Sequence, residues 1–177
     1  MHVLSTSFSR IVSPAGISLA RILILLVVTL PLAQVRAEEQ SEEITVDAVI
    51  AEMNVYRGDH GLPLLQGDQR LHRAAEDRID DMERQGYWGH YPPDGSSPFL
   101  WLPLRGYHYR QAGENLAAGL ESLDLLVSSW MSSPGHRANI LSPEYADVGI
   151  GIIDGGTTGR RSGKSVVVLF AAERGKR

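Results

Sequence analysis

Three short segments carry the side chains best suited to chemistry, and each places a histidine or a glutamate directly after a glycine. These residues are His90, Glu114 and His136. Two neutral imidazoles and one carboxylate provide three ligands for a divalent ion such as zinc or calcium, and they leave a position for water. The same three groups can also bind one another without metal, so both arrangements stay open from the residues alone.

The spacing of these residues is not a local catalytic motif. The separations are 24 residues from 90 to 114 and 22 from 114 to 136, and the chain has neither His-Glu-x-x-His nor Gly-x-Ser-x-Gly. Ser132 and Ser133 precede His136, but the sequence offers no evident third member for a catalytic triad with a serine and this histidine. With no cysteine in the chain, thiolate zinc sites are excluded. A binding protein is therefore favoured over a nucleophilic enzyme.

A glycine before each polar residue predicts how the three come together. Glycine permits a sharp turn and close backbone approach, so we expect His90, Glu114 and His136 at the rim of one pocket. A shared metal would require His90 and His136 to lie within about 10 Å of each other. The aromatic-rich segment 86–113 is expected to wall this pocket. Glu114 either ligates an ion or accepts backbone N–H groups at a turn, and Asn115 is interpreted as a turn-forming amide.

The elements that must position these residues are predicted from apolar periodicity and capping residues. Thr45 and Asp68 are expected to begin the first two helices, and Gly86 to end the second. A break at Pro134-Gly135 is expected to end the third main helix. The predicted helices are 44–55, 68–86, 97–104 and 122–131.

The end of the chain is typical of strands. Residues 148–153 alternate glycine with apolar residues, and Val166–Phe170 is a continuous apolar run suited to a central strand. Helices that precede strands favour an α+β fold. We predict a three-layer α/β/α sandwich around a central antiparallel sheet.

The first residues are typical of an export signal rather than of the fold. Arg10 and Arg21 flank an apolar run over 22–32, and residues 35–37 are suited to signal peptidase. The run is shorter than the roughly 20 residues of a membrane span, although an uncleaved, tilted anchor is the alternative. We expect a secreted or periplasmic protein with a signal peptide at 1–37, a flexible tail at 38–43 and one domain at 44–173.

The charge of the chain excludes some partners. The whole chain has 17 basic and 21 acidic residues, a net charge of −4. Loss of residues 1–37 would remove three arginines and no acid, leaving 14 basic against 21 acidic residues, or −7. Such a chain is poorly suited to nucleic acid or to an anionic membrane surface. We expect a monomer without a stable membrane span after signal cleavage.

These segments resemble the signature motifs of the CAP superfamily, which includes cysteine-rich secretory proteins, antigen 5 and plant pathogenesis-related 1 proteins. The resemblance is to its bacterial, cysteine-free, SCP-like extracellular branch, and it covers nearly the whole chain after the signal. The matching segments occur in family order. They are Asn54-x-x-Arg57, 60–64, His90 with 93–95, 113–117, 133–141 and 148–151.

The resemblance implies an α/β/α sandwich with a cleft that holds two histidines and, in many members, two glutamates. By motif, His90, Glu114 and His136 match three of the four positions, and the fourth glutamate is replaced by Ser133. With one carboxylate fewer, a metal site at His90, His136 and Glu114 is weakened. The last strand also departs from bacterial relatives, because 166–171 lacks their Trp-Thr-Gln run.

Three functional hypotheses follow. The first is a non-enzymatic binding module whose cleft takes a small amphiphile, a peptide, an envelope component or a metal ion. The alternative is a metal-dependent hydrolase or peptidase in which His90 and His136 hold the ion and Glu114 ligates it or acts as base for bound water. A third is a purely structural envelope component in which the cleft has no role.

Overall fold

A computed structural model describes residues 42–155 and 162–175, which belong to one folded unit, Glu39–Arg177. The predicted signal peptide 1–37 and most of the predicted tail lie outside the described residues. Among the helices of the described ranges, none combines the length and hydropathy that crossing a bilayer requires.

The first two helices confirm their predicted capping residues. Helix α1 is Val46–Asp59, and the Thr45 side chain accepts a hydrogen bond from its first turn. Helix α2 is Gln69–Gln85, begins after Asp68 and ends at Gly86, which has a left-handed φ of 68°. Glycine adopts this conformation without a Cβ penalty and ends the helix there.

Three further helices follow: α3 Trp101–Leu104, α4 Leu123–Ser132 and α5 Pro134–Ile140. The helix predicted at 122–131 is confirmed as α4, with Ser122 as its cap. The predicted end of this helix before Pro134 is confirmed, since α4 ends at Ser132 and Ser133 is extended. Pro134 then occupies the first turn of a new helix, which was not predicted. Proline fits this position, where its missing N–H has no helical partner. His136 therefore stands on a helix.

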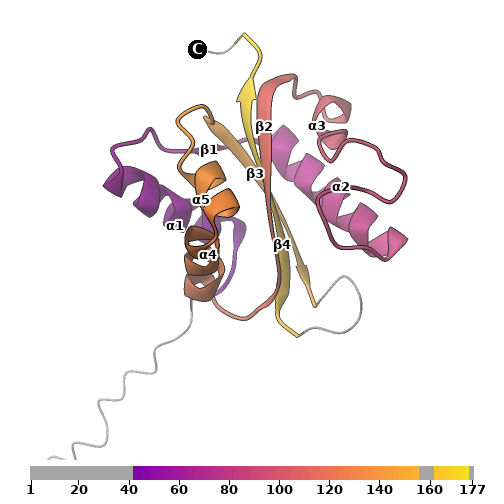
Figure 1. Cartoon of the computed structure of the whole chain (residues 1–177), viewed down its shortest axis with the longest axis horizontal. Helices are drawn as coiled ribbons and strands as arrows, with labels where there is room; N and C mark the ends of the chain where they lie inside the picture. The colour runs from indigo at the N-terminus through magenta and orange to yellow at the C-terminus, as the bar shows by residue number, and fades with distance from the viewer. Residues whose placement is uncertain (1–41, 156–161, 176–177) are drawn as a thin grey trace, which may run out of the picture. The chain divides into compact units, whose positions relative to one another are not determined.

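The strands form one four-stranded sheet, in the order β1-β3-β4-β2 (Figure 1). Their bounds are β1 Gln66–Gly67, β2 Tyr109–Leu120, β3 Asp147–Asp154 and β4 Lys164–Glu173. The predicted central strand is confirmed, since β4 pairs antiparallel with both β3 and β2. The two-residue β1 is parallel to β3, which makes the sheet mixed rather than wholly antiparallel.

Strand β2 corrects the interpretation that Glu114 and Asn115 lie in a turn. Both Glu114 and Asn115 lie in the middle of a 12-residue strand, paired with Leu169 and Val168 of β4. The local sequence is rich in Gly, Ala, Glu and Asn, which are depleted in strands. Pairing with the apolar β4 overrides that local preference.

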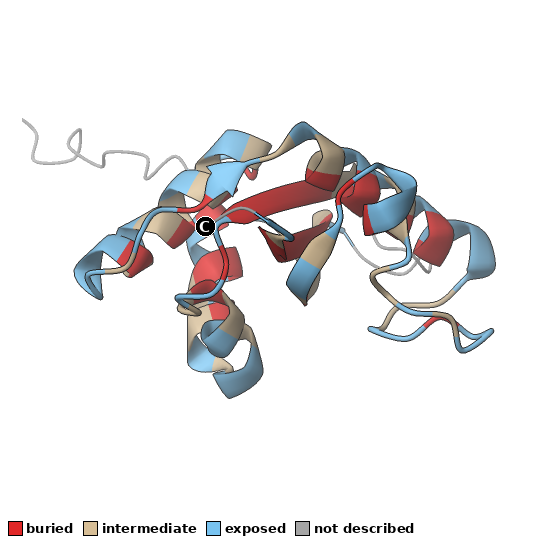
Figure 2. Cartoon of the chain, turned by 90° about the horizontal axis from the view of Figure 1, so that it is seen from above, coloured by how far each residue is buried: buried red, intermediate tan, exposed pale blue. Residues whose placement is uncertain are grey.

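Two helical layers cover the two faces of the sheet, as the sandwich prediction required. Side chains of β4 alternate between two buried clusters, one packed with α1, α4 and α5 and the other with α2 and α3. Figure 2 shows buried positions concentrated along the strands, with exposed helix faces outside. The three-layer α/β/α arrangement is confirmed.

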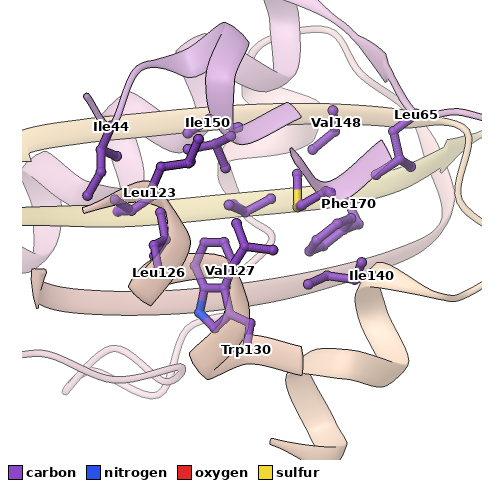
Figure 3. Close-up of a cluster of buried hydrophobic side chains, with 14 of the residues drawn as sticks. Ile44, Leu65, Leu123, Leu126, Val127, Trp130, Ile140, Val148, Ile150 and Phe170 are labelled. Atoms are coloured by element: carbon purple, nitrogen blue, oxygen red, sulfur yellow. The ribbon is translucent and has the colours of Figure 1, made fainter. Parts of the chain in front are cut away.

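Trp130 of α4 anchors the first cluster. Its side chain is buried, and its indole N–H donates to the Leu116 carbonyl at 3.2 Å. Figure 3 shows it with Val127, Ile140 and Phe170 among the residues gathered between the helices and the strands. The other two tryptophans, at 88 and 101, are partly buried against the second cluster.

We predict that Trp130→Ala lowers the free energy of unfolding by about 3–5 kcal/mol, because it leaves a large cavity in this cluster. Denaturant unfolding measures the change. Leu125→Ala is the matched control on the same helix, since Leu125 is 57% exposed and should cost under about 1 kcal/mol. A loss below about 1 kcal/mol for Trp130→Ala would contradict the position assigned to this residue.

The alternating glycines of β3 let α2 approach the sheet. A Cβ at Gly151 would lie 2.6 Å from the backbone oxygen of Ala75, and one at Gly149 would overlap the backbone of Leu71. Since the clashing atoms are helix backbone, rotation of a side chain cannot relieve them. The glycines therefore set the distance between α2 and β3.

We predict that Gly151→Ala destabilises the fold by about 1–3 kcal/mol or more, because α2 must move away from β3. Gly58→Ala is the control, since Gly58 lies in α1 with open space around its missing Cβ. It should leave stability unchanged or raise it by about 0.5–1 kcal/mol. Equal effects of the two substitutions in a thermal melt would refute the packing argument.

Candidate functional site

Glu114 is the buried centre of the candidate site. Its two carboxylate oxygens have different partners. Oε1 lies 2.8 Å from Nδ1 of His90, and Oε2 accepts a hydrogen bond of 3.0 Å from Nε of Arg78. The side chain of Glu114 is 2% exposed, so both interactions are shielded from water. Glu114 thus fixes the ring of His90, a role different from the predicted acceptance of backbone N–H groups at a turn.

Arg78 of α2 was not predicted as a site residue. Besides Glu114, it donates to the hydroxyl of Tyr87 and to the carbonyls of Gly89 and His90, the last two at 2.7 and 3.0 Å. Its side chain is fully buried. The signal was present in the sequence, because Arg78 occupies an apolar-facing position of the second helix, where an unpaired charge is not tolerated.

His136 is held by a set of side-chain amides. Asn115 of β2 donates from Nδ2 to the His136 carbonyl at 3.1 Å. Asn139, one turn further along α5, donates to the Glu114 carbonyl at 3.1 Å and to Oδ1 of Asn115 at 2.8 Å. These bonds fix α5 against β2. Asn115 therefore joins a strand to a helix and is not the turn-forming amide that was expected.

The imidazoles of His90 and His136 face each other across the site. Their ring centroids are 6.5 Å apart and the rings are tilted by 50°. This separation agrees with the expected approach within about 10 Å. Three sequence-predicted residues, spread from 90 to 136, therefore lie in one cluster.

The prediction that a glycine before each polar residue allows close backbone approach holds at Gly113 but not at Gly89 or Gly135. A Cβ at Gly113 would lie 2.7 Å from both Asn139 Oδ1 and Tyr145 Oη, so the strand needs glycine for close packing. At Gly89 and Gly135 the space is open, and neither has a positive φ. No sharp turn positions these two histidines. Hydrogen bonds from Arg78 to the backbone hold His90 in place, and His136 lies in the first turn of α5.

The two imidazoles differ in their electrostatics. The hydrogen bond to the Glu114 carboxylate raises the pKa of His90 above its ordinary value, although burial opposes the shift. Burial lowers the pKa of His136, and the nearby charge of His90 lowers it further. On acidification His90 takes up a proton first, and its charge then disfavours protonation of His136.

The donor set fits a metal held by the two histidines better than the predicted three-ligand set. In the described ranges, no three His, Asp or Glu side chains are grouped to hold an ion together. Because Nδ1 of His90 faces Glu114, its Nε2 is the nitrogen available to a metal, with the carboxylate as orienting partner. Imidazoles sharing a tetrahedral zinc have centroids about 5 Å apart, so the pair must close slightly from 6.5 Å.

An apolar groove adjoins the histidine pair. It has a volume of about 340 Å³ and lies between the second half of β2, the end of α4 and the start of α5. Ser133, at the predicted fourth cleft position, lines it together with His136. The other lining residues are Leu116, Ala117, Ala118, Leu120, Ser129 and Trp130.

Two proteins of Bacillus subtilis are similar to this chain in sequence. The chain is 37% identical over 109 residues to the uncharacterized protein YkwD of Bacillus subtilis (strain 168), and 32% identical over 99 residues to the uncharacterized membrane protein YlbC of the same strain. These alignments cover 62% and 56% of this chain. They span 42% and 29% of the relatives, so the chain matches less than half the length of either.

Solved structures share the fold. An outer surface protein from Borrelia burgdorferi superposes with a TM-score of 0.64 at 20% identity, covering 76% of this chain and 99% of that one. An extracellular SCP-domain protein from Bacillus anthracis gives 0.61 at 25% identity, over 75% and 45% of the two chains. The family model of the cysteine-rich secretory protein family, CAP, matches residues 50–170, and the chain belongs to that family.

Proposed function

We propose that the chain is an exported, non-enzymatic binding protein, with residues 1–37 as its signal and 44–173 as its binding domain. The cleft formed by His90, Glu114, Ser133 and His136 binds a small amphiphile or an apolar peptide segment from the cell envelope. The carrying observation is that the histidine pair opens directly onto an apolar groove, since His136 belongs to both. The extracellular and outer-surface relatives support an exported location.

The chemistry of the cleft suits a ligand with a polar end and an apolar body. His90 and His136 supply ring nitrogens for the polar end, and Glu114 holds His90 in place. Alanine and leucine side chains of β2 line the apolar part. Sites of this kind combine a mostly apolar lining with a few oriented polar groups.

Zinc binding at the same histidine pair is part of this proposal. Two imidazoles are suitable zinc ligands, whereas calcium prefers a shell of oxygen ligands that the described residues of this site do not provide. A bound ion would supply a positive charge at the polar end of the cleft. His90 and His136 would hold it, and Glu114 would orient His90.

The hydrolase hypothesis has weaker support. A base that activates water needs a free carboxylate oxygen, but one oxygen of Glu114 accepts from Arg78 and the other faces His90. Neither serine is placed as a nucleophile. The Ser132 hydroxyl donates to the Ser128 carbonyl at 2.9 Å, and within the described ranges no hydrogen bond joins Ser133 to His136. The geometry therefore favours binding without turnover.

We predict that decanoate binds in the groove and that Ala117→Leu weakens it at least about tenfold, because the added side chain occupies apolar space next to His136. Isothermal titration calorimetry measures the affinity. Ala138→Leu is the matched control, since Ala138 is exposed on α5 and does not line the groove. The proposal fails if decanoate does not bind, or if both variants bind it equally.

We predict that zinc binds the protein and calcium does not, with affinity lost on acidification from the pKa of His90 downward. Protonation removes the lone pair that a metal needs, and Glu114 raises the pKa of His90, so the loss begins above the ordinary histidine value of about 6.5. Calorimetry at several pH values checks this.

Variants separate this site from adventitious zinc binding. His90→Gln and His136→Gln should each weaken zinc binding at least about tenfold. His60→Gln is the control, because His60 is exposed and its ring nitrogens lie near the Tyr56 carbonyl and the Arg137 side chain rather than near Glu114 or another histidine. Zinc affinity that is the same in all three variants would rule out the histidine pair as the site.

A further inference from the structure

A second hollow lies at the end of the sheet where β2 begins and β4 ends. Figure 1 shows these two strand ends side by side. Its volume is about 590 Å³. None of the cleft residues lines it. The lining residues are Pro103, His108, Tyr109, Arg110 and Arg174.

Backbone pairing between the start of β2 and the end of β4 brings the residues of this hollow together. The Arg174 N–H donates to the His108 carbonyl at 2.7 Å, and Tyr109 pairs with Glu173. The register shifts between Tyr109 and Gln111, which places Arg110 at a bulge. A bulge redirects the side chain of the extra residue, so His108, Arg110 and Arg174 line the same hollow.

The charges of the hollow contrast with those of the chain. None of its lining residues is acidic, although the chain carries a net charge of −4. Within residues 42–155 and 162–175, the guanidinium of Arg174 forms no ion pair, and Arg174 is exposed. Arg110 and Arg174 line one hollow, and like charges at one site favour the binding of an anion.

The nearby acidic residues, Glu144 and Glu173, do not fully neutralise the positive charge of Arg110 and Arg174. Arg110 donates to the Glu144 carboxylate at 2.8 Å and to the Glu144 carbonyl at 3.3 Å. Both side chains are about half exposed, at 49% and 51%, so solvent screens the pair. Glu173 is bound to Arg70 at 2.6 Å. The hollow therefore keeps an excess of positive charge that an anionic ligand would neutralise.

We propose that this hollow is a second ligand site, which binds a phosphate group carried on a small organic moiety. Guanidinium groups bind phosphate oxygens through paired hydrogen bonds. The two guanidinium groups carry two positive charges, and the single carboxylate of Glu144 neutralises one of them. Pro103 and Tyr109 also line the hollow and provide contacts for the organic part. The site is independent of the histidine cleft, so the failure of either proposal leaves the other standing.

NMR titration of the protein with inorganic phosphate, phenyl phosphate and acetate, at constant ionic strength, tests the site. Saturable shifts of the His108 and Arg174 amide signals are expected with both phosphates, with acetate at least about tenfold weaker. Phenyl phosphate should bind more tightly than inorganic phosphate because Pro103 and Tyr109 provide contacts for its apolar ring. Equal affinity of the two phosphates would overturn the organic part of the proposal and support a free phosphate ion at the same site.

Arginine-to-glutamine substitutions inside and outside the hollow test whether the phosphate binds there. Arg174→Gln and Arg110→Gln should each weaken phosphate binding at least about tenfold, since each removes a charge-assisted contact. Arg84→Gln removes the same charge from a side chain that is 69% exposed in the last turn of α2, and it should change affinity less than about twofold. Acetate binding equal to phosphate, absence of saturation, or equal losses in all three variants would overturn the proposal.

Discussion

The buried ion pair between Arg78 and Glu114 is the interaction on which the site depends. Both side chains are almost fully buried, at 0% and 2% exposure, so each charge requires complete pairing. Arg78 meets this requirement with the Glu114 carboxylate, a tyrosine hydroxyl and two carbonyls of the segment that carries His90. The pairing joins α2, β2 and the loop that bears His90. Removal of either partner would leave a buried charge, at a cost of about 3–5 kcal/mol, and would release that loop.

A second buried arginine fixes the other side of the domain without any carboxylate. Arg57 of α1 is fully buried and donates to the carbonyls of Pro63, Ile140, Ser142 and Tyr145. Burial lowers the pKa of this guanidinium, and four carbonyl oxygens take the place of water around it. Because Ile140 ends α5, this set of bonds helps to hold the helix that bears His136. The two histidines are therefore positioned by two arginines from different layers of the sandwich.

The edge of the sheet explains why a groove lies beside the histidines. Strand β2 is at the edge, where unpaired backbone groups invite pairing with another chain. Trp130 and Asn139 donate to the Leu116 and Glu114 carbonyls and so cover that edge with α4 and α5. Helices bound to a strand through side chains stand further from it than a neighbouring strand would. The apolar groove lies along this boundary.

The sequence alone determined the sandwich, the caps of α1, α2 and α4, the central strand and the proximity of residues 90, 114 and 136. These features depend on local periodicity, capping and motif order. It did not determine the strand at 113–117, the helix at 134–140 or the partners of Glu114. Those depend on pairing with β4 and on a charge from α2, which are distant in the chain. Only the tertiary structure decided that Glu114 orients His90, because the energy of a buried charge is set by what surrounds it.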